Sequence, residues 1–320
     1  MILMIISFFI YCNSLRKMIH CHPMERVHRF VSNDFTVRAA AVNATIAVRE
    51  MQKIQNTQPL PTLAVGRAMV GALLMASHLK EKQQVGIYVR GDGPMGRVYA
   101  EASFEGHVRG YTPHTYFEPE QYQPGLKLKE YIGQGTLSVT RHMPFQKQPH
   151  HGMVELISSE IGEDISHYLI QSHQIRSVIS LGVYLDTYGK VQSAGGVLVE
   201  VMPGVEEEVV QILEKNAQAL KTSISKEILN GVAATEFVKP FLQGIPFTEL
   251  DHNFPISYSC PCTEERVVQA LESLGEEELD DMIKNKEVAE VRCQVCGRPY
   301  EIGVERLQEI KNKLYRQSLN

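Results

Sequence analysis

The sequence lacks the features by which several classes of protein are recognised. Acidic residues outnumber basic ones, and the net charge of −5 excludes the bulk positive charge that favours nucleic-acid binding. There is no P-loop, no nucleophile elbow and no H-x-E partner for a zinc deaminase. Pairs of Asp and Glu are frequent, but none lies in a recognisable catalytic frame. We therefore expect a protein that is not an enzyme and has no nucleic-acid partner.

The N-terminal segment lacks a hydrophobic run long enough to cross a membrane. Residues 1–11 are apolar, whereas a spanning helix needs ~20 residues. No positive region precedes this run, Arg16 and Lys17 follow it, and no small-residue cleavage site marks a signal peptide. We expect no membrane partner. Residues 1–23 differ in character from the rest, and we expect an N-terminal extension from a mis-assigned start, with Met24 or Met18 as the true start.

Cysteine is scarce, and its distribution is the most informative feature of the chain. Two of the six cysteines, Cys12 and Cys21, lie in the N-terminal extension. The other four form two close pairs separated by a helix-sized insert. Zn²⁺ binds four soft ligands in a tetrahedron, which two short cysteine pairs can supply. The sequence therefore predicts one zinc ion bound by Cys260, Cys262, Cys293 and Cys296.

The two pairs differ in spacing. Cys293 and Cys296 have the two intervening residues typical of zinc knuckles, and Gly297 follows them, where a positive φ is often needed. Cys260 and Cys262 have only one intervening residue, which is unusual for zinc. This spacing also places two thiolates close enough to oxidise to each other.

Two interpretations of the cluster follow from the residues. In the first, it is a structural knuckle that only folds its small domain. In the second, it is a redox switch, since zinc-bound cysteine is a thiolate, the form that oxidants attack, and loss of the metal would unfold the domain. Four cysteine ligands leave the metal no open position, which argues against metal catalysis. The cluster also implies a reducing compartment, because an oxidising one would convert it to disulfides.

The pattern from residue 24 to 204 predicts an α+β core domain with a mixed, mostly antiparallel sheet. Residues 91–96 formally match G-x-G-x-x-G, but Pro94 lies inside the match and a strand follows, so we expect a hairpin loop and not a phosphate site. Asp186 to Gly189 supply a second turn. The expected elements are a buried helix at 63–80, a strand pair at 86–90 and 97–103, and another at 175–185 and 191–201.

Two local expectations concern the middle of this domain. Ser159 is a plausible N-cap for a helix whose apolar face carries Ile161, Ile165 and Leu169. The adjacent histidines at 150 and 151 follow Pro149, and we expect them in an exposed loop without ligand geometry.

The remaining chain divides into a linker and a small domain. Residues 205–255 predict a helical linker, whose first helical stretch runs to about Gly231 with an apolar stripe weakened near Asn216 and Thr222. Residues 256–320 predict a zinc-binding domain with a helix capped by Thr263 and ended by Gly275, a hairpin at 291–302 and a terminal helix. Its few large apolar residues make a thin core that zinc would stabilise.

The chain resembles the heat-shock protein 33 family, the redox-regulated holdase chaperones of bacteria, from about Met24 almost to the C-terminus. The Cys-x-Cys plus Cys-x-x-Cys arrangement is similar to the zinc switch of that family. One departure is Ser172-His173-Gln174, where the family usually has Ser-Glu-Gln. The other similar stretches are 38–45 (RAAAVNAT), 65–67 (VGR), 90–94 (RGDGP), 106–111 (GHVRGY), 133–137 (GQGTL), 194–196 (AGG) and 202–204 (MPG).

The resemblance implies a mechanism. In the reduced protein the four cysteines would hold zinc and the chaperone would be inactive. Oxidation would form the disulfides Cys260–Cys262 and Cys293–Cys296, release zinc, unfold the C-terminal domain and loosen the linker. The exposed apolar surface would bind unfolding client proteins without ATP. The resemblance further implies a homodimer on activation, transfer of clients to ATP-dependent foldase chaperones, and a cytoplasmic location.

Two other functions also rely on close cysteine pairs. A zinc-ribbon nucleic-acid binder predicts a basic, aromatic face near the knuckle, whereas residues 276–281 are strongly acidic. A thiol oxidoreductase that uses Cys293 and Cys296 would place this pair at a helix N-terminus in a βαβ unit, and the surrounding sequence is strand-like.

Overall fold

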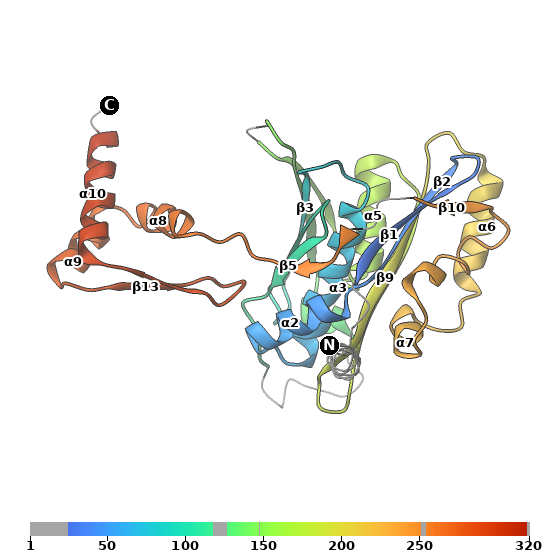
Figure 1. Cartoon of the computed structure of the whole chain (residues 1–320), viewed down its shortest axis with the longest axis horizontal. Helices are drawn as coiled ribbons and strands as arrows, with labels where there is room; N and C mark the ends of the chain where they lie inside the picture. Colours follow the sequence, from blue (N-terminus) through green and yellow to red (C-terminus); the bar gives the residue numbers. More distant parts are fainter. Residues whose placement is uncertain (1–24, 118–126, 147, 251–253, 319–320) are drawn as a thin grey trace, which may run out of the picture.

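Two six-stranded sheets lie on either side of a buried helix in the computed structural model, which describes residues 25–117, 127–146, 148–250 and 254–318 (Figure 1). The first sheet has the strand order β10-β1-β2-β9-β8, with β11 also paired to β1. Its strands are β1 (Arg26–Ser32), β2 (Val37–Asn43), β8 (Ser177–Leu185), β9 (Val191–Val201), β10 (Phe247–Glu249) and β11 (Phe254–Pro255).

The second sheet has the strand order β12-β5-β4-β3-β6-β7. Within the described residues every strand pair is antiparallel except β12 with β5, which is parallel. The strands are β3 (Gln84–Gly91), β4 (Arg97–Ser103), β5 (His107–Tyr111), β6 (Gly135–His142), β7 (His150–Glu155) and β12 (Ser257–Tyr258).

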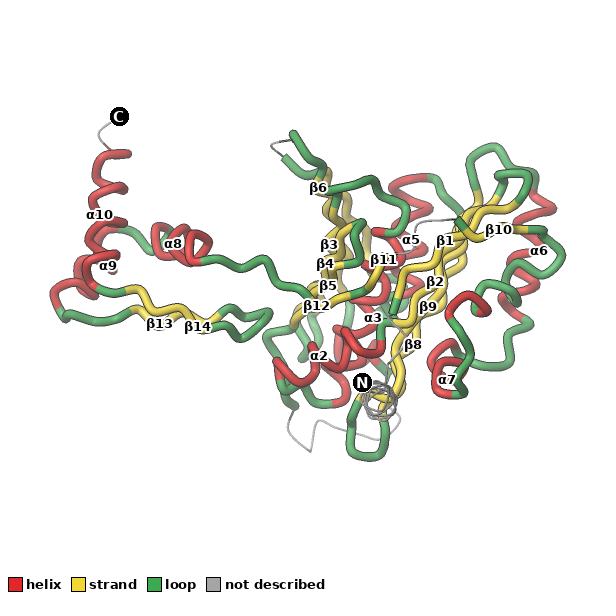
Figure 2. The backbone as a smooth tube through the Cα atoms, in the orientation of Figure 1, coloured by secondary structure: helices red, strands yellow, loops and turns green. Residues whose placement is uncertain are grey.

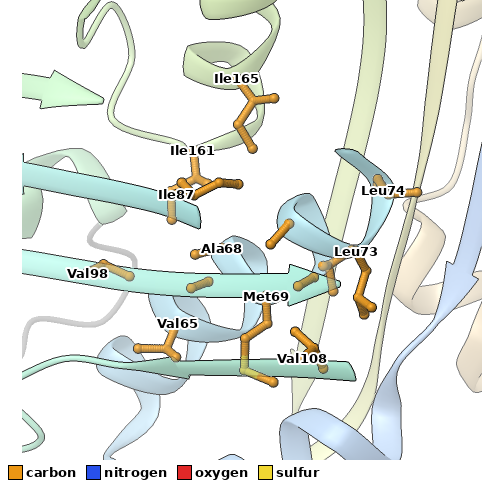
Figure 3. Packing of buried hydrophobic residues seen from close by; sticks show 14 of the residues in the cluster. Val65, Ala68, Met69, Leu73, Leu74, Ile87, Val98, Val108, Ile161 and Ile165 are labelled. Carbon is orange, nitrogen blue, oxygen red and sulfur yellow. The ribbon is translucent and has the colours of Figure 1, made fainter. Parts of the chain in front are cut away.

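Helix α3 (Pro59–Ala76) fills the space between the sheets because it is apolar on every side. Val65 and Met69 face Val98 and Val108 of the second sheet (Figure 3). By length and composition this helix could cross a membrane, but 83% of its apolar window is buried inside the protein. It is therefore the core helix of this domain.

Three further helices surround this core: α2 (Thr45–Gln55), α4 (Leu128–Ile132) and α5 (Gly162–His173). The predicted cap of α5 is wrong. Ser159 lies outside the helix with φ +60°, and the Asp164 carboxylate instead accepts N–H bonds from Ile157, Ser158 and Ile161. A carboxylate three residues into the helix thus replaces the hydroxyl as the cap.

The outer face of the first sheet is covered by the segment that follows β9. It contains α6 (Glu207–Gln218), α7 (Ile224–Leu229) and the short 3₁₀ helix η2 (Ala234–Glu236). Buried apolar residues of α6 and of 237–242 pack against β2 and β9 there. The single stretch expected up to Gly231 is divided, because the chain leaves the helical conformation after α6 and Ser223 precedes α7 in an extended one.

The C-terminal elements lie apart from the sheets, at the left of Figures 1 and 2. They are α8 (Glu264–Glu272), α9 (Glu276–Lys284), β13 (Ala289–Arg292), β14 (Pro299–Ile302) and α10 (Val304–Ser318). Their apolar core is small, with Leu279 and Leu307 at its centre. Thr263 takes the predicted N-cap position of α8, but its side chain makes no capping hydrogen bond, and α8 ends at Glu272, before Gly275. That glycine, with φ +93°, instead precedes α9.

The α+β class with mostly antiparallel sheets is confirmed, as are both predicted strand pairs of the core. Residues 91–96 form the turn between β3 and β4, where an added Cβ on Gly91 would lie 1.7 Å from the carbonyl oxygen of Ile132. The loop thus packs closely against its own chain. His150 and His151 are exposed as expected, but they begin strand β7 and do not lie in a loop. The proposed extension at 1–23 lies outside the described residues.

Candidate metal centre

The four cysteines of the two pairs converge on one point. Their Sγ atoms all lie within 4.8 Å of one another, and all four residues are half-buried. Sγ of Cys260 lies 3.7 Å from that of Cys293, and Sγ of Cys262 lies 3.3 Å from that of Cys296. Zinc–sulfur bonds of about 2.3 Å in a tetrahedron place sulfurs about 3.8 Å apart. The four thiols therefore fit a tetrahedral Zn²⁺ site.

Each pair is positioned by a short piece of strand. Cys260 lies two residues beyond β12, which adds to the edge of the second sheet through β5. Cys293 and Cys296 lie in the turn between β13 and β14, where the N–H of Gly297 bonds to the carbonyl of Cys293 at 2.8 Å. Gly297 has φ +68°, which confirms the predicted need for glycine at this knuckle.

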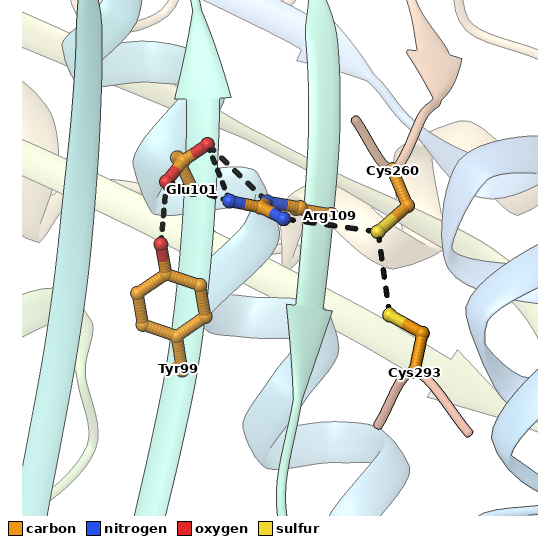
Figure 4. Close-up of polar contacts among 5 residues, drawn as sticks. All are labelled: Tyr99, Glu101, Arg109, Cys260 and Cys293. Carbon is orange, nitrogen blue, oxygen red and sulfur yellow. Dashed lines mark hydrogen bonds and ion pairs between the residues drawn. The ribbon is translucent and has the colours of Figure 1, made fainter. Parts of the chain in front are cut away.

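Side-chain donors from outside the two cysteine pairs reach the knuckle or its sulfurs. The Tyr300 hydroxyl donates to Sγ of Cys262 at 3.1 Å, and Nη1 of Arg109 lies 3.7 Å from Sγ of Cys260 (Figure 4). Nε2 of Gln55 donates to the carbonyl oxygen of Val295 at 3.0 Å. Hydrogen bonds to thiolate ligands orient a metal site and stabilise its charge.

Burial and neighbouring thiols set the ionisation of the cluster. Burial works against the thiolate of Cys262, but hydrogen bonds from Tyr300 and the other cysteines outweigh it and lower the pKa of Cys262 to about 7. Burial raises the pKa of Cys296 to about 12, and the hydrogen bonds to Cys262 and Cys293 also raise it. Four thiols so close together need a cation to ionise together, which a divalent metal supplies.

The cluster is docked on the core through the second pair as well as the first. Val295, between Cys293 and Cys296, is buried, and its carbonyl also accepts a 2.8 Å hydrogen bond from Tyr258. Cβ of an alanine at Gly297 would lie 3.8 Å from Ile54 of α2. The knuckle therefore rests on the C-terminal end of α2.

All four metal-ligand candidates named from the sequence are brought together, while the residues that support them were missed. Gln55 and Arg109 come from α2 and β5, far from the cysteines in sequence, whereas Tyr258 and Tyr300 lie next to the pairs in β12 and β14. Tyr258 is two residues before Cys260 and Tyr300 is four residues beyond Cys296, and this proximity is the signal that local sequence offered. Arg109 lies in the stretch GHVRGY that carried part of the family resemblance, but nothing in that stretch indicated a contact with cysteine.

The surroundings of the cluster differ from those that a thiol oxidoreductase or a zinc-ribbon nucleic-acid binder needs. Cys293 and Cys296 lie in a β-hairpin turn and not at the start of a helix, which is where a reactive thiol pair gains its low pKa. Helix α9, which lies between the two pairs in sequence, begins with Glu276, Glu277 and Glu278. These features favour neither a thiol oxidoreductase nor a nucleic-acid interface.

Comparison with known proteins assigns the fold and the cluster to one family. The model of the Hsp33 protein family matches residues 25–303. The chain belongs to the Hsp33 family. The match begins just after the proposed extension and includes both cysteine pairs, which confirms the resemblance seen in the sequence.

Individual Hsp33 relatives agree over nearly their whole length. The chain is 36% identical over 291 residues to the 33 kDa chaperonin of Desulforamulus reducens, covering 89% of this chain and 97% of the relative. It is 32% identical over 296 residues to the 33 kDa chaperonin of Bacillus pumilus, covering 92% of this chain and 100% of the relative. The crystal structure of the 33 kDa chaperonin (heat shock protein 33 homolog) of Thermotoga maritima superposes with a TM-score of 0.80 at 32% identity. The superposition covers 93% of this chain and 100% of that structure. The protein is therefore a chaperone of this family.

Proposed function

We propose that this Hsp33 protein is a redox-regulated, ATP-independent holdase. The observation that carries the proposal is that the four-cysteine cluster is joined, through one continuous segment, to the cover of a large apolar sheet face. In the reduced state Cys260, Cys262, Cys293 and Cys296 would hold one Zn²⁺, which cross-links the start and the middle of the small C-terminal domain.

Oxidation would remove these ligands in pairs. Two thiolates form each disulfide and give one electron pair to a peroxide or similar two-electron oxidant, which takes up two protons and leaves as water. We propose the pairings Cys260–Cys262 and Cys293–Cys296. Neighbours in sequence stay close when the domain opens, whereas pairing across the cluster needs the folded hairpin. A disulfide sulfur is no longer an anionic ligand, so zinc is released.

Loss of zinc would destabilise residues 256–320, the proposed switch domain. In its described part, eight apolar residues form the buried core. A core of this size contributes little stability by itself, so a structural metal accounts for much of the free energy of folding of such a domain.

Short strand pairings near residue 255, where the proposed linker ends, connect the cysteine cluster to the core sheets. The N–H of Ser259, next to Cys260, bonds to the Val108 carbonyl of β5 at 3.0 Å, and β10 and β11 pair with β1 upstream. These pairings are two or three residues long. An unfolding C-terminal domain would therefore readily detach them, which loosens residues 205–255, the proposed linker.

Detachment of the linker would uncover the face of the first sheet. This face consists of alternate residues of β2 and β9, and its partners on the linker are buried with it. Unfolding proteins expose apolar side chains, so a newly exposed apolar face of this kind would bind them. The sheet residues are Val37, Ala39, Ala41, Val197, Val199 and Val201, and the linker residues include Val210, Leu213, Phe237 and Phe241.

The proposal also includes a homodimer in the activated state, release of clients to ATP-dependent foldase chaperones, and a cytoplasmic location.

The proposal is tested by zinc content and by light scattering of a thermally aggregating protein, each measured before and after peroxide. We expect about one zinc per reduced chain, its release by peroxide, and suppression of aggregation by the oxidised protein only. A Cys293→Ser variant serves as control: it should bind zinc weakly and respond little to peroxide. Retained zinc and unchanged scattering after oxidation of the wild type would show that the site is structural.

A further inference from the structure

Arg109 connects the core sheet to the cysteine cluster. It lies on β5 directly opposite Glu101 of β4, and the two residues form a cross-strand pair. Nε of Arg109 lies 3.2 Å from Oε1 of Glu101, and Nη2 lies 3.1 Å from Oε2. The remaining nitrogen, Nη1, faces Sγ of Cys260 at 3.7 Å (Figure 4).

The guanidinium is held by the core and not by the C-terminal segment. Glu101 is fixed in turn by the Tyr99 hydroxyl, which donates to Oε2 at 2.5 Å, and Tyr99 packs on Tyr111 of β5 with ring centroids 5.8 Å apart. The side chains of Arg109 and Glu101 are 14% and 13% exposed. A planar cation so fixed by a bidentate carboxylate presents its free N–H in one direction, toward the sulfur.

The contact between Arg109 and Cys260 would stabilise the negative charge of the zinc-bound cluster. A Zn²⁺ bound by four thiolates carries net negative charge, which a cation at hydrogen-bond distance stabilises. An N–H donor also draws electron density from the thiolate, and a less basic sulfur is a weaker nucleophile toward an oxidant. Both effects act in the same direction, toward retention of the reduced, metal-bound form.

We propose that Arg109 is a positioning residue that stabilises Cys260 as a metal ligand and thereby sets the oxidant level at which the cluster is lost. This inference rests on the proposed zinc function. It places the control of the switch in the core sheet, on a residue outside both cysteine pairs and outside the linker.

The test uses the full-length, reduced, zinc-loaded protein with one of two substitutions. Arg109→Gln removes the positive charge, and Arg109→Lys keeps the charge but loses the planar, two-nitrogen contact with Glu101. Arg67→Gln is the matched control, because Arg67 also forms a partly buried ion pair with a glutamate of the core, Glu160. Zinc release is followed with a metallochromic dye under two conditions, a fixed peroxide concentration and an excess of chelator without oxidant.

We expect release from Arg109→Gln to be about tenfold faster than from the wild type under both conditions, as is typical when a residue supporting a metal ligand is lost. Arg109→Lys should be intermediate, and Arg67→Gln should match the wild type. Thiol trapping with mass spectrometry should show the acceleration first at Cys260, which a general loosening of the domain would not produce.

Wild-type release rates in Arg109→Gln and Arg109→Lys would overturn the inference. If Arg109→Gln does not fold, judged by circular dichroism, Arg109→Lys decides alone: faster release supports the inference and an unchanged rate overturns it. Failure of the proposed function has a different signature, since zinc would then stay bound to the wild type in peroxide while the chelator arm still measures the effect of Arg109.

Discussion

The hydroxyl of Tyr258 donates a 2.8 Å hydrogen bond to the carbonyl oxygen of Val295 and so joins the strand that leads to the first cysteine pair to the turn that holds the second. Gln55 of α2 donates to the same carbonyl and lies 3.3 Å from the Tyr258 hydroxyl. The two halves of the cysteine cluster are thus tied to each other and to the core by the protein itself.

Removal of the Tyr258 hydroxyl should loosen the knuckle locally. Tyr258→Phe loses one hydrogen bond to a buried carbonyl, at a cost of about 1 kcal/mol, while Gln55 still contacts Val295. We expect faster amide hydrogen exchange in residues 289–302 and no change in β3 and β4. Tyr188→Phe is the control, because Tyr188 is 87% exposed in the β8–β9 turn. Equal exchange in both variants would mean that this bond does not fix the knuckle.

Removal of zinc under reducing conditions should unfold only the C-terminal elements. The core around α3 is large and contains no cysteine, whereas the cluster of Leu279, Leu307 and their neighbours is small. With chelator and reductant we expect loss of amide protection over 264–318 and its retention in α3 and β9, with recovery when zinc is returned. Protection that persists over 264–318 would show that the domain folds without metal.

Disulfide mapping after peroxide should find neighbours in sequence joined. The sulfurs of Cys260 and Cys293 lie 3.7 Å apart in the folded state, so trapping before the domain opens would give bonds across the cluster. We expect Cys260–Cys262 and Cys293–Cys296, because short loops close at lower entropic cost once the domain has opened. Peptide mass spectrometry without reduction distinguishes the two patterns, and a majority of cross-cluster bonds would refute the proposed order of events.

The linker can be weakened without touching the cysteines. Leu213 of α6 is 2% exposed against the sheet, and Ile212 beside it is 40% exposed, which makes the pair a matched test. Leu213→Ala should cost the linker about 2–4 kcal/mol and shift aggregation suppression to lower peroxide, whereas Ile212→Ala should act as wild type. If Leu213→Ala needs as much oxidant as the wild type, packing of α6 does not restrain the switch.

The core should lose stability at mildly acid pH through His78. Burial lowers the pKa of His78 to about 4 from its ordinary 6.5, although Oε2 of Glu200 lies 3.1 Å from its Nε2 and opposes the shift. Between pH 6.5 and 4 the unfolded chain binds a proton that the folded chain does not. The free energy of unfolding therefore falls as pH falls, by at most ~1.4 kcal/mol per pH unit.

His78→Gln should remove this contribution, so that denaturant unfolding at pH 7 and pH 5 differs less than in the wild type. His151→Gln, in an exposed position of β7, should keep the wild-type difference. The interpretation is wrong if both variants lose stability equally with acid.

Local pattern was enough to find several elements of the core and the four cysteines that come together. Strands β3, β4, β8 and β9 follow from alternation and turn residues, and the two cysteine pairs are recognised by spacing alone. What local pattern misses is contact across the chain. Strand β12 is two residues long and pairs with β5 about 150 positions earlier, so no periodicity could show it.

The supporting contacts of the cluster were missed for the same reason. Arg109 and Gln55 are ordinary polar residues of a strand and a helix, and only the fold brings them to Cys260 and Val295. Likewise, residue type favours Ser159 as the helix cap, but Asp164 can accept several N–H bonds at once and takes that role.

Loss of zinc and gain of holdase activity should be one event, and a peroxide titration that follows both in the same sample tests this most directly. Zinc released per chain and suppression of client aggregation should rise together along one curve, and both should return after reductant and zinc are added. Complete zinc release without suppression of aggregation, or suppression while zinc is still bound, would contradict the account.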